Sequence, residues 1–332
     1  MKIVFYQTQK WEENYIKKKL KGHKIIFCKE ILNEETAKLA RDADAISIFI
    51  YSNVNKAVLD KMKKLKLVTT RSTGYDHIDL IECKRRGITV CNVPTYGENT
   101  VAEHTFALIL SLSRKIHKSY LKTLRNDFTI DGLEGFDLKG KTIGVIGAGH
   151  IGLHVIRIAK GFGMNVLVNT LHLDKFLAEV MGFEYVNLEE LLKRSDIITI
   201  HVPYNKDTHH LINKDNIKLI KKGAILINTA RGGCVDTEAL IEALDKGILS
   251  GAGLDVIEGE ELIKEEKQLI YDKDKLKNLG NLVKDHILLS RDNVIFTPHI
   301  AFYSREALLR ILDTTIENIE YFSKKTPINV VN

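Results

Sequence analysis

Short apolar runs rich in β-branched residues alternate with amphipathic stretches along most of the chain. Among residues 1–98 these runs predict five strands, at Lys2–Tyr6, Lys24–Phe27, Ala45–Ile50, Leu65–Thr70 and Ile88–Cys91. Strands separated by helical patterns of ~10–15 residues are typical of a parallel sheet with helices on both faces. The first part of the chain is therefore expected to be an α/β domain.

The alternation breaks at Pro94–Asn99. Asn99 or Thr100 can cap a helix, and a long, mostly apolar helix is expected from there to about Lys122. Its length favours a role as a connector between domains. Residues 126–140, with three glycines, are expected to form an irregular link.

The strand and helix pattern then resumes. Strands are predicted at Thr142–Ile146, Val166–Asn169, Asp196–His201, Ala224–Asn228, Ala252–Val256 and Asn293–Thr297. Helices are predicted after Gly152, from Asp236 to Asp245 and over residues 305–323, with a charged helical excursion over 260–292. This pattern indicates a second α/β domain.

Three glycines follow the first strand of this second domain. Gly147, Gly149 and Gly152 form the pattern G-x-G-x-x-G between a strand and a helix. In a dinucleotide site the first glycine turns the chain, the second leaves room for the pyrophosphate and the third lets helix and strand pack closely. The helix N-terminus then faces the phosphates. We therefore expect a dinucleotide cofactor here.

Composition narrows the class of protein. A chain of 332 residues with 44% hydrophobic and 28% charged residues favours a soluble protein of two domains. It has no apolar run of the ~18–20 residues that a membrane span needs, so no membrane partner is expected. Cys28, Cys83, Cys91 and Cys234 lack paired spacing, which favours reduced thiols in a cytoplasmic protein.

The net charge of +6 raises the question of nucleic-acid binding. The excess is Lys (37) rather than Arg (12), and it is spread over helix faces without interleaved aromatic residues. We therefore expect no nucleic-acid partner. His201, His209 and His210 lack the spacing of metal ligands and are expected in a surface turn, so no metal is predicted.

Three polar residues follow predicted strands at positions suited to the reduction of a 2-oxo acid. Arg231 offers a guanidinium that can bind a carboxylate bidentately, and His299 offers a proton near neutral pH. Glu260 offers a carboxylate that would raise the pKa of a neighbouring imidazole. Taken singly, Arg231 is better explained as a structural ion-pair residue and His299 as a capped turn histidine. The loop Arg71–Asp79 is equally open to two interpretations, a plain glycine turn or a loop that presents N–H groups to a ligand.

Several motifs together resemble the D-2-hydroxyacid dehydrogenase family. They are Gly144–Gly152, His201–Tyr204, Ile227–Gly233 with Val235–Thr237, Gly253–Val256 and Thr297–Ala301, in matching order and spacing from about residue 45 to the end. Within the family the chain most resembles the D-lactate dehydrogenases, through Arg71–Asp79, Tyr96, Ile257–Glu260 and His299–Tyr303.

The resemblance implies two doubly wound parallel-sheet domains, of the Rossmann and flavodoxin-like type, with a cleft between them. Residues 1–98 plus 299–332 would form the substrate domain, and 99–298 the inserted cofactor domain. The expected reaction is NADH-dependent reduction of a small 2-oxo acid, pyruvate first, to the D-2-hydroxy acid. A homodimer through the cofactor domain is expected as well.

The resemblance also implies roles for individual residues. Arg231 would bind the substrate carboxylate and carbonyl, His299 would be the acid/base and Glu260 its partner. The remaining substrate contacts would come from Thr73, Gly74, Tyr96 and Phe302. Cofactor contacts would come from Gly147, Gly149, His150, Ile151, Gly152, Thr170, His201, Val202, Pro203, Thr229, Ala230 and Asp255.

Thr170 departs from the family pattern. An acidic residue ~20 positions after the glycines commonly binds the ribose 2′-hydroxyl of NAD, and Thr170 stands in that place. NADP is therefore expected to be tolerated beside NAD. Two rival activities stay open, a D-3-phosphoglycerate or glyoxylate/hydroxypyruvate reductase and a non-catalytic NAD(H)-sensing protein of the same fold.

Overall fold

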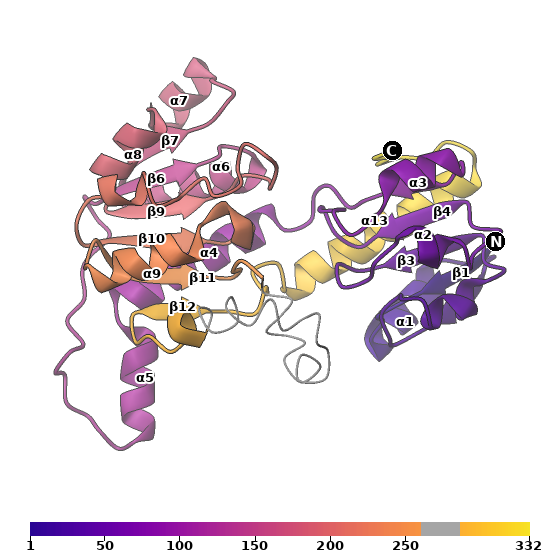
Figure 1. The fold of residues 1–332 in the computed structure, drawn as a ribbon, viewed down its shortest axis with the longest axis horizontal. Coiled ribbons are helices and arrows are strands. Elements are labelled where there is room, and N and C mark those ends of the chain that lie inside the picture. Colours follow the sequence, from indigo (N-terminus) through magenta and orange to yellow (C-terminus); the bar gives the residue numbers. More distant parts are fainter. Residues whose placement is uncertain (260–285) are drawn as a thin grey trace. The chain divides into compact units, whose positions relative to one another are not determined.

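The computed structural model describes residues 1–259 and 286–332. Backbone contacts divide the chain into two compact units (Figure 1). Unit 1 comprises Met1–Tyr96 and Ser304–Asn332, and unit 2 comprises Gly97–Tyr303. The boundaries expected from the sequence, after residue 98 and before residue 299, differ from these by two and five residues.

Unit 1 is built on a five-stranded sheet. Its order is β2-β1-β3-β4-β5, and every recorded pairing is parallel. The strands are β1 (Lys2–Phe5), β2 (Lys24–Phe27), β3 (Ala45–Ile48), β4 (Leu67–Thr70) and β5 (Thr89–Cys91). All five strands predicted from the sequence are confirmed.

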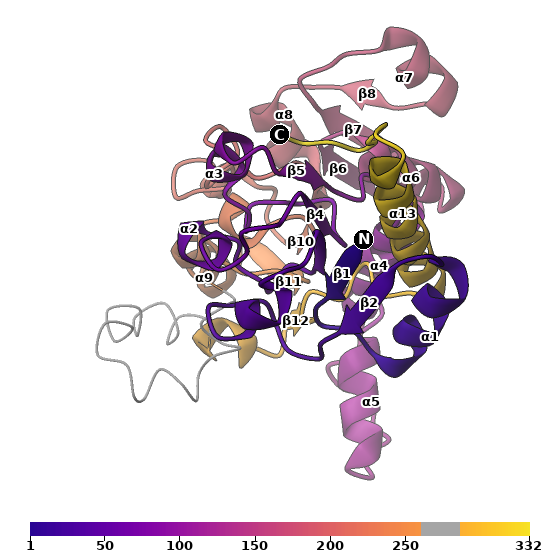
Figure 2. The ribbon, with the colours of Figure 1, turned by 90° about the vertical axis from the view of Figure 1, so that its right-hand side faces the viewer.

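Helices cover both faces of this sheet because alternate strand residues point to opposite sides. One face, which includes Val4 and Tyr6, packs under a 3-10 helix (Thr36–Ala40), α2 (Lys56–Leu59) and α3 (Leu80–Arg85). The other face, which includes Ile3 and Phe5, packs under α1 (Lys10–Lys19) and α13 (Arg305–Ser323). Figure 2 shows α1 and α13 side by side. The predicted helix over 305–323 is confirmed.

Unit 2 is built on a seven-stranded sheet of order β12-β11-β10-β9-β6-β7-β8, again with parallel pairings. The strands are β6 (Thr142–Ile146), β7 (Asn165–Asn169), β8 (Glu184–Tyr185), β9 (Ile197–Ile200), β10 (Ala224–Asn228), β11 (Leu249–Leu254) and β12 (Val294–Phe296). The sequence did not predict the two-residue strand β8. The two sheets confirm the predicted fold class of two parallel-sheet α/β domains.

The helices of unit 2 also lie on both faces of its sheet (Figure 1). One face packs against α4 (Glu98–Ser113) and α6 (His150–Gly161), and the other against α8 (Leu188–Arg194) and α9 (Thr237–Asp245). The unit also contains α5 (Ile116–Leu124), α7 (Lys175–Met181) and two 3-10 helices, Ile217–Leu219 and Gly232–Cys234. Asp236 caps α9 through its carboxylate, as the sequence predicted.

The single connector helix predicted up to about Lys122 is wrong, because the chain breaks into α4 and α5. In a continuous helix the Ser113 carbonyl would accept from the N–H of the residue four positions later. It accepts instead from the Phe136 N–H at 2.9 Å. Lys115 then takes a left-handed conformation with φ of 55°. The predicted cap at Asn99 or Thr100 is also wrong, since Gly97 is the N-cap of α4.

Two further expectations concern the end of β11 and the charged excursion. β11 ends at Leu254 rather than Val256, so that Asp255 follows the strand instead of lying inside it. Of the excursion predicted over 260–292, residues 260–285 lie outside the described residues, and 286–289 are helical. Among the described helices, none combines the length and the apolar character needed to cross a membrane.

Candidate active site

The cofactor residues predicted from the sequence gather at one edge of the sheet in unit 2. Gly147 follows β6, Thr170 follows β7, His201 follows β9, Thr229 follows β10 and Asp255 follows β11. Parallel strands end on the same edge, called here the carboxyl edge. The strand order reverses between β6 and β9, and ligands of doubly wound sheets bind at such a point.

The glycine turn after β6 has the geometry that a dinucleotide needs. A Cβ at Gly147 would lie 2.6 Å from the His201 carbonyl oxygen, and one at Gly152 would lie 2.0 Å from the Gly147 carbonyl oxygen. A Cβ at Gly149 would meet nothing within 4 Å, and Gly149 is the N-cap of α6. Two glycines thus permit the close packing, and the third leaves open space at a helix N-terminus, where phosphate is favoured. The residues present therefore fit a dinucleotide.

His201 lies against this turn. Its backbone N–H donates to the Ile146 carbonyl at 2.7 Å, and its Nε2 is 2.8 Å from the Thr199 hydroxyl. Nδ1 is buried and has no hydrogen-bond partner in the described part of the chain. Burial lowers the pKa of His201 to about 3, so the ring is neutral near pH 7. A neutral ring with one unpaired buried nitrogen is suited to a polar ligand atom.

Thr170 lies beside the glycine turn. The Gly147 N–H donates to the carbonyl of Asn169 at 2.8 Å, so the residue after β7 adjoins the turn after β6. Thr170 is half-buried, whereas residues 171–176 are exposed, with His172 and Lys175 among them. No carboxylate therefore stands at the position where an acidic residue was expected.

Arg231 belongs to a loop that Asn228 holds from within. The buried side chain of Asn228 donates through Nδ2 to the Arg231 carbonyl at 2.9 Å and accepts through Oδ1 from the Ala230 N–H at 3.0 Å. The Arg231 guanidinium donates to the Ala230 carbonyl at 2.8 Å. Thr229 is fixed by a hydroxyl pair with Thr105 of α4 at 3.0 Å. Guanidinium and loop are thus placed at the carboxyl end of β10.

His299 has a left-handed backbone with φ of 56°, which is uncommon for histidine. Its N–H donates to the carbonyls of Asp255 at 2.9 Å and Thr297 at 2.8 Å. The buried Asp255 carboxylate accepts from the N–H groups of Ile300 and Ala301, both at 2.9 Å. Asp255 thereby fixes the turn at His299.

His104 of α4 extends this network. Its Nε2 is 2.9 Å from the Thr297 hydroxyl, which donates to Asp255 Oδ1 at 2.6 Å. Burial lowers the pKa of His104, and the neighbouring Asp255 carboxylate opposes that shift. A line of polar side chains therefore connects α4 to the residues that surround His299.

Unit 1 presents the loop after β4 that contains Thr73 and Gly74. The Thr73 hydroxyl donates to the Val93 carbonyl at 2.9 Å, and the Thr73 carbonyl accepts from Asn92 Nδ2 at 2.8 Å. Among the described residues, the N–H groups of Thr73 and Gly74 have no recorded acceptor. This loop therefore has N–H groups to present, which favours the second of its two interpretations.

Arg71 precedes that loop and is almost wholly buried. It donates to the carbonyls of Tyr6 at 2.7 Å and Gln7 at 3.0 Å. Burial lowers the pKa of Arg71 to about 10, so the guanidinium keeps its charge at pH 7. It fastens the end of β1 to the end of β4.

The other predicted residues stand as follows. Tyr96 ends the first segment of unit 1 and is half-buried, and its carbonyl accepts from Arg310 Nε at 2.6 Å. Phe302 of unit 2 is buried and packs edge to face with Tyr303. Glu260 lies outside the described residues.

Sequence reasoning missed Asn228, Thr297 and His104. Asn228 and Thr297 each stand at or just after the end of an apolar run, which is a usable signal. His104 is one polar residue in an apolar helix, and its contact with Thr297 spans 193 residues, so no local pattern marks it.

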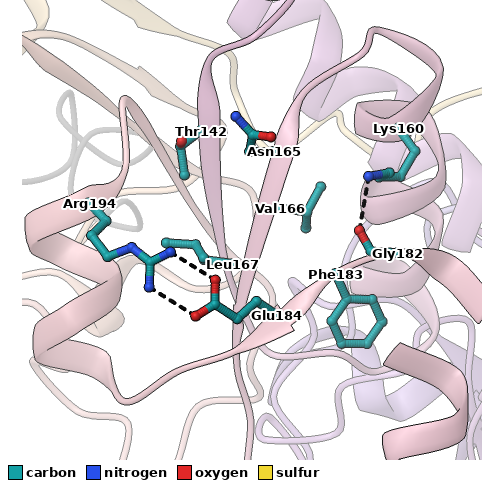
Figure 3. A pocket seen from close by; sticks show the side chains of 9 residues that line it. All are labelled: Thr142, Lys160, Asn165, Val166, Leu167, Gly182, Phe183, Glu184 and Arg194. Carbon is teal, nitrogen blue, oxygen red and sulfur yellow. Dashed lines mark hydrogen bonds and ion pairs between the residues drawn. The ribbon is translucent and has the colours of Figure 1, made fainter. Parts of the chain in front are cut away.

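A cavity of about 380 Å³ lies elsewhere in unit 2, at the opposite edge of its sheet. Its lining includes Thr142 and Asn165, the first residues of β6 and β7. Figure 3 shows the Arg194 guanidinium directed at the Glu184 carboxylate, with contacts of 2.8 and 3.0 Å. This cavity is therefore distinct from the candidate active site. Within residues 1–259 and 286–332, no group of three His, Cys, Asp or Glu side chains is placed to hold a metal ion.

A doubly wound sheet with this glycine turn defines a class of dinucleotide-binding proteins, and comparison with known proteins narrows that class. The family model for the "D-isomer specific 2-hydroxyacid dehydrogenase, NAD binding domain" matches residues 106–301. The D-lactate dehydrogenase of Escherichia coli is 35% identical, over 98% of this chain and 97% of that relative. An aromatic 2-oxoacid reductase of Clostridium sporogenes is 38% identical, over 92% and 90%.

A solved structure is similar over nearly the whole length. The D-lactate dehydrogenase from Aquifex aeolicus, complexed with NAD and lactic acid, has a TM-score of 0.85 at 39% identity and covers 98% of this chain and 96% of that one. The chain belongs to the D-2-hydroxyacid dehydrogenase family. Within it the chain is similar to the D-lactate dehydrogenases, and NAD is the cofactor that its matched domain binds.

Proposed function

We propose that the protein reduces a small 2-oxo acid, pyruvate first, to the D-2-hydroxy acid with NADH as reductant. One observation carries the proposal. Arg231 and His299 follow β10 and β12, the two neighbours of β11, at the edge of the sheet that carries the glycine turn. A cation for the carboxylate and a proton donor for the carbonyl oxygen are the two groups that this reduction requires from the protein.

Arg231 is assigned the carboxylate and the carbonyl oxygen of the substrate. Its guanidinium can donate two parallel hydrogen bonds to a carboxylate. The bond from Asn228 to its carbonyl holds the backbone in place. When a substrate binds, only the side-chain torsions of Arg231 then need to adjust, because its backbone is already fixed.

His299 is assigned the proton transfer. NADH, when bound, supplies the hydride. His299 delivers a proton to the carbonyl oxygen of the substrate, and it takes that proton back in the reverse direction. Asp255 orients His299 by fixing the next two backbone N–H groups. Glu260 keeps its proposed role as partner of His299 on the ground of the family resemblance alone.

Unit 1 is assigned further donors for the same class of substrate. The N–H groups of Thr73 and Gly74 suit a carboxylate, which accepts strongly from backbone donors. Tyr96 and Phe302 are assigned to the side chain of the 2-oxo acid, because aromatic faces suit a methyl group. Each of these four assignments stays a proposal.

A turnover assay tests the function. Purified protein is mixed with NADH and pyruvate, and the loss of absorbance at about 340 nm is followed, which is the general signature of nicotinamide oxidation. We expect turnover and a product of D configuration. Absence of turnover with any 2-oxo acid, together with saturable NADH binding, would instead favour a non-catalytic NAD(H)-sensing protein.

A second candidate substrate is a 2-oxo acid with a bulky side chain. The aromatic 2-oxoacid reductase of Clostridium sporogenes, at 38% identity, supports it. A panel of pyruvate, 4-methyl-2-oxopentanoate, phenylpyruvate, glyoxylate, hydroxypyruvate and phosphohydroxypyruvate ranks the candidates by kcat/KM. We expect pyruvate to lead. A clear preference for phenylpyruvate would move the assignment to the bulky class, and one for the last three would favour the other reductases.

We also propose that NADPH is accepted beside NADH. An acidic residue at position 170 would accept from the 2′-hydroxyl of NAD and repel the 2′-phosphate of NADP. Thr170 supplies no repelling charge, and the exposed His172 and Lys175 lie a few residues further on. Discrimination between the two cofactors should therefore be weak.

The variant Thr170→Asp tests this cofactor preference. It should sharpen the preference for NADH, mainly by lowering kcat/KM for NADPH. A wild-type preference for NADH above ~10³-fold would contradict the proposal, because that ratio requires ~4 kcal/mol of discrimination. The double variant His172→Gln, Lys175→Gln removes the two basic side chains. Its kcat/KM for NADPH shows how much they contribute, apart from the missing carboxylate at position 170.

The last proposal concerns a homodimer through unit 2. Figures 1 and 2 both show α5 projecting from the body of unit 2, and none of its residues is buried. Its exposed apolar side chains include Ile116, Tyr120, Leu121 and Leu124. A helix with so little burial is marginal on its own in water, so a second copy of the chain is the occupant proposed for it.

Size-exclusion chromatography with light-scattering detection measures the oligomeric state. We expect a dimer for the wild type and a shift toward monomer for the double variant Leu121→Asp, Leu124→Asp. Phe176→Asp, at an exposed apolar residue of α7, serves as the matched control and should leave the dimer intact. A monomeric wild type would remove the proposal.

A further inference from the structure

The loop that carries Arg231, residues 229–235, is called here the arginine loop. It packs directly on the glutamate loop, residues 255–259, which follows β11. A Cβ at Gly232 would lie 2.0 Å from the Ile257 carbonyl oxygen, so the two backbones touch at this point. Gly232 and Gly233 are consecutive and offer no side chains. The orientation of this segment must therefore come from its neighbours.

His210 contacts both loops from a third segment of the chain. Its N–H donates to the Gly233 carbonyl at 2.8 Å, and its Nε2 is 2.7 Å from Glu258 Oε1. The other oxygen of Glu258 accepts from the Thr237 hydroxyl at 3.5 Å. One residue thus joins the arginine loop through its backbone and the glutamate loop through its ring.

The conformation of His210 is itself held in place. Its φ is 47°, a left-handed value that costs free energy for a histidine. Asn213 Nδ2 donates to its carbonyl at 3.0 Å, and the His209 ring stacks on its own ring with 3.9 Å between centroids. Surrounding contacts therefore keep an uncommon backbone geometry, and such geometry is concentrated at functional sites.

We propose that His210 is a positioning residue for the substrate-binding guanidinium of Arg231. Asn228 holds the arginine loop from the inner side through the Arg231 carbonyl, and His210 holds it from the outer side through the Gly233 carbonyl. The Glu258 carboxylate fixes the His210 ring, and so holds in place the residue whose backbone N–H makes the outer contact. The inference rests on the function proposed above for Arg231.

The expected kinetic effect follows from the role of the guanidinium. Arg231 binds the carboxylate in both the ground state and the transition state, and loss of such uniform binding raises KM more than it lowers kcat. A misplacement of the order of 1 Å can cost about 100-fold. His210→Ala should therefore raise KM for the 2-oxo acid roughly 10- to 100-fold and leave KM for NADH nearly unchanged.

Conservative variants separate the hydrogen bond from the backbone effect. In His210→Gln the amide nitrogen of the side chain reaches the place of Nε2 and can still donate to Glu258. In His210→Asn the side chain is too short to reach, although asparagine tolerates a left-handed backbone better than histidine. We expect His210→Gln to rescue KM and His210→Asn to resemble His210→Ala. The matched control His154→Gln changes a histidine of α6 whose ring contacts Arg157, and it should retain the wild-type KM.

Hydrogen exchange supplies a readout that does not need turnover. Peptides covering residues 229–235 should exchange faster in His210→Ala and His210→Asn than in the wild type, and at the wild-type rate in His210→Gln. Unchanged exchange there in His210→Ala would overturn the inference, whatever the activity. So would an active wild type with no change of KM in His210→Ala. A wild type that reduces no 2-oxo acid overturns the function proposed for Arg231, and the exchange data still decide whether His210 orders the loop.

Discussion

Position 299 has two requirements. The proposed proton transfer needs an imidazole there, and the backbone has to adopt a left-handed conformation. Asparagine accepts that backbone readily but has no group that titrates near pH 7. His299→Asn should therefore fold at least as well as His299→Ala and lower kcat by ~10²–10⁴. Turnover with pyruvate measures kcat, and a fluorescence titration with NADH shows whether the folded cofactor site is retained. A comparable loss of NADH affinity would instead indicate a structural role for His299.

His201 should make the stability of unit 2 dependent on pH. Burial lowers the pKa of His201 to about 3, whereas an unfolded histidine titrates near 6.5. Between these values the unfolded chain binds the extra proton, so the free energy of unfolding falls as the pH decreases through this window. Urea denaturation at pH 7 and pH 5 measures the loss.

His201→Gln should reduce that loss of stability on acidification. His172→Gln, at an exposed histidine of the same unit, is the control and should behave as the wild type does. Equal acid sensitivity in His201→Gln and the wild type would mean that other groups cause it.

At the scale of elements, the turn between β6 and α6 contains glycines with two different roles, close packing and open space. A side chain at Gly152 collides with the Gly147 carbonyl, and one at Gly149 extends into open space. Gly152→Ala should therefore destabilise the fold by roughly 1–3 kcal/mol and weaken NADH binding. Gly149→Ala should leave the Tm unchanged and weaken NADH binding on the order of 10-fold or more, which is about 1.4 kcal/mol.

Thermal unfolding and NADH titration of the two variants check this contrast. A Gly149→Ala protein with wild-type NADH affinity would show that the open space is not the place of the pyrophosphate. A stable Gly152→Ala protein would show that the turn relaxes easily.

Elements whose cause is local could be predicted from the sequence. The apolar run Ala224–Asn228 and the capping Asp236 each act within a few residues, and β10 and α9 appear where they were expected. The break between α4 and α5 depends on the Phe136 N–H, which lies 23 residues beyond the Ser113 carbonyl that it binds. No periodic pattern within the helix encodes such a competitor.

The candidate site shows the same division. Strand ends and glycine spacing indicated Gly147, Arg231 and His299 because topology brings such ends to one edge. The bond from His210 to Glu258 joins residues 48 positions apart, and the turn in which it lies looked like an ordinary surface turn. The left-handed backbones of His210 and His299 follow from tertiary contacts, so single-residue preferences gave no indication of them.

At the scale of the whole molecule, unit 2 is one continuous segment, and unit 1 is assembled from both sides of it. One sheet face of unit 1 depends on the second segment, because Ile3, Phe5 and Leu67 pack with Leu312, Ile316 and Ile319 of α13. A chain that ends at residue 303 should therefore keep unit 2 folded and leave unit 1 open to hydrogen exchange. Equal protection of residues 1–96 in the short and full chains would contradict this.

The same connectivity sets an order of events on the ribosome. A nascent chain emerges from its N-terminus, so the strands of unit 1 leave the exit tunnel first, while α13 is still to be made. All of unit 2 is available to collapse before that helix appears. The earliest part of the protein to be synthesised is thus the last to be completed, and its bare sheet face is what a chaperone would meet in the interval.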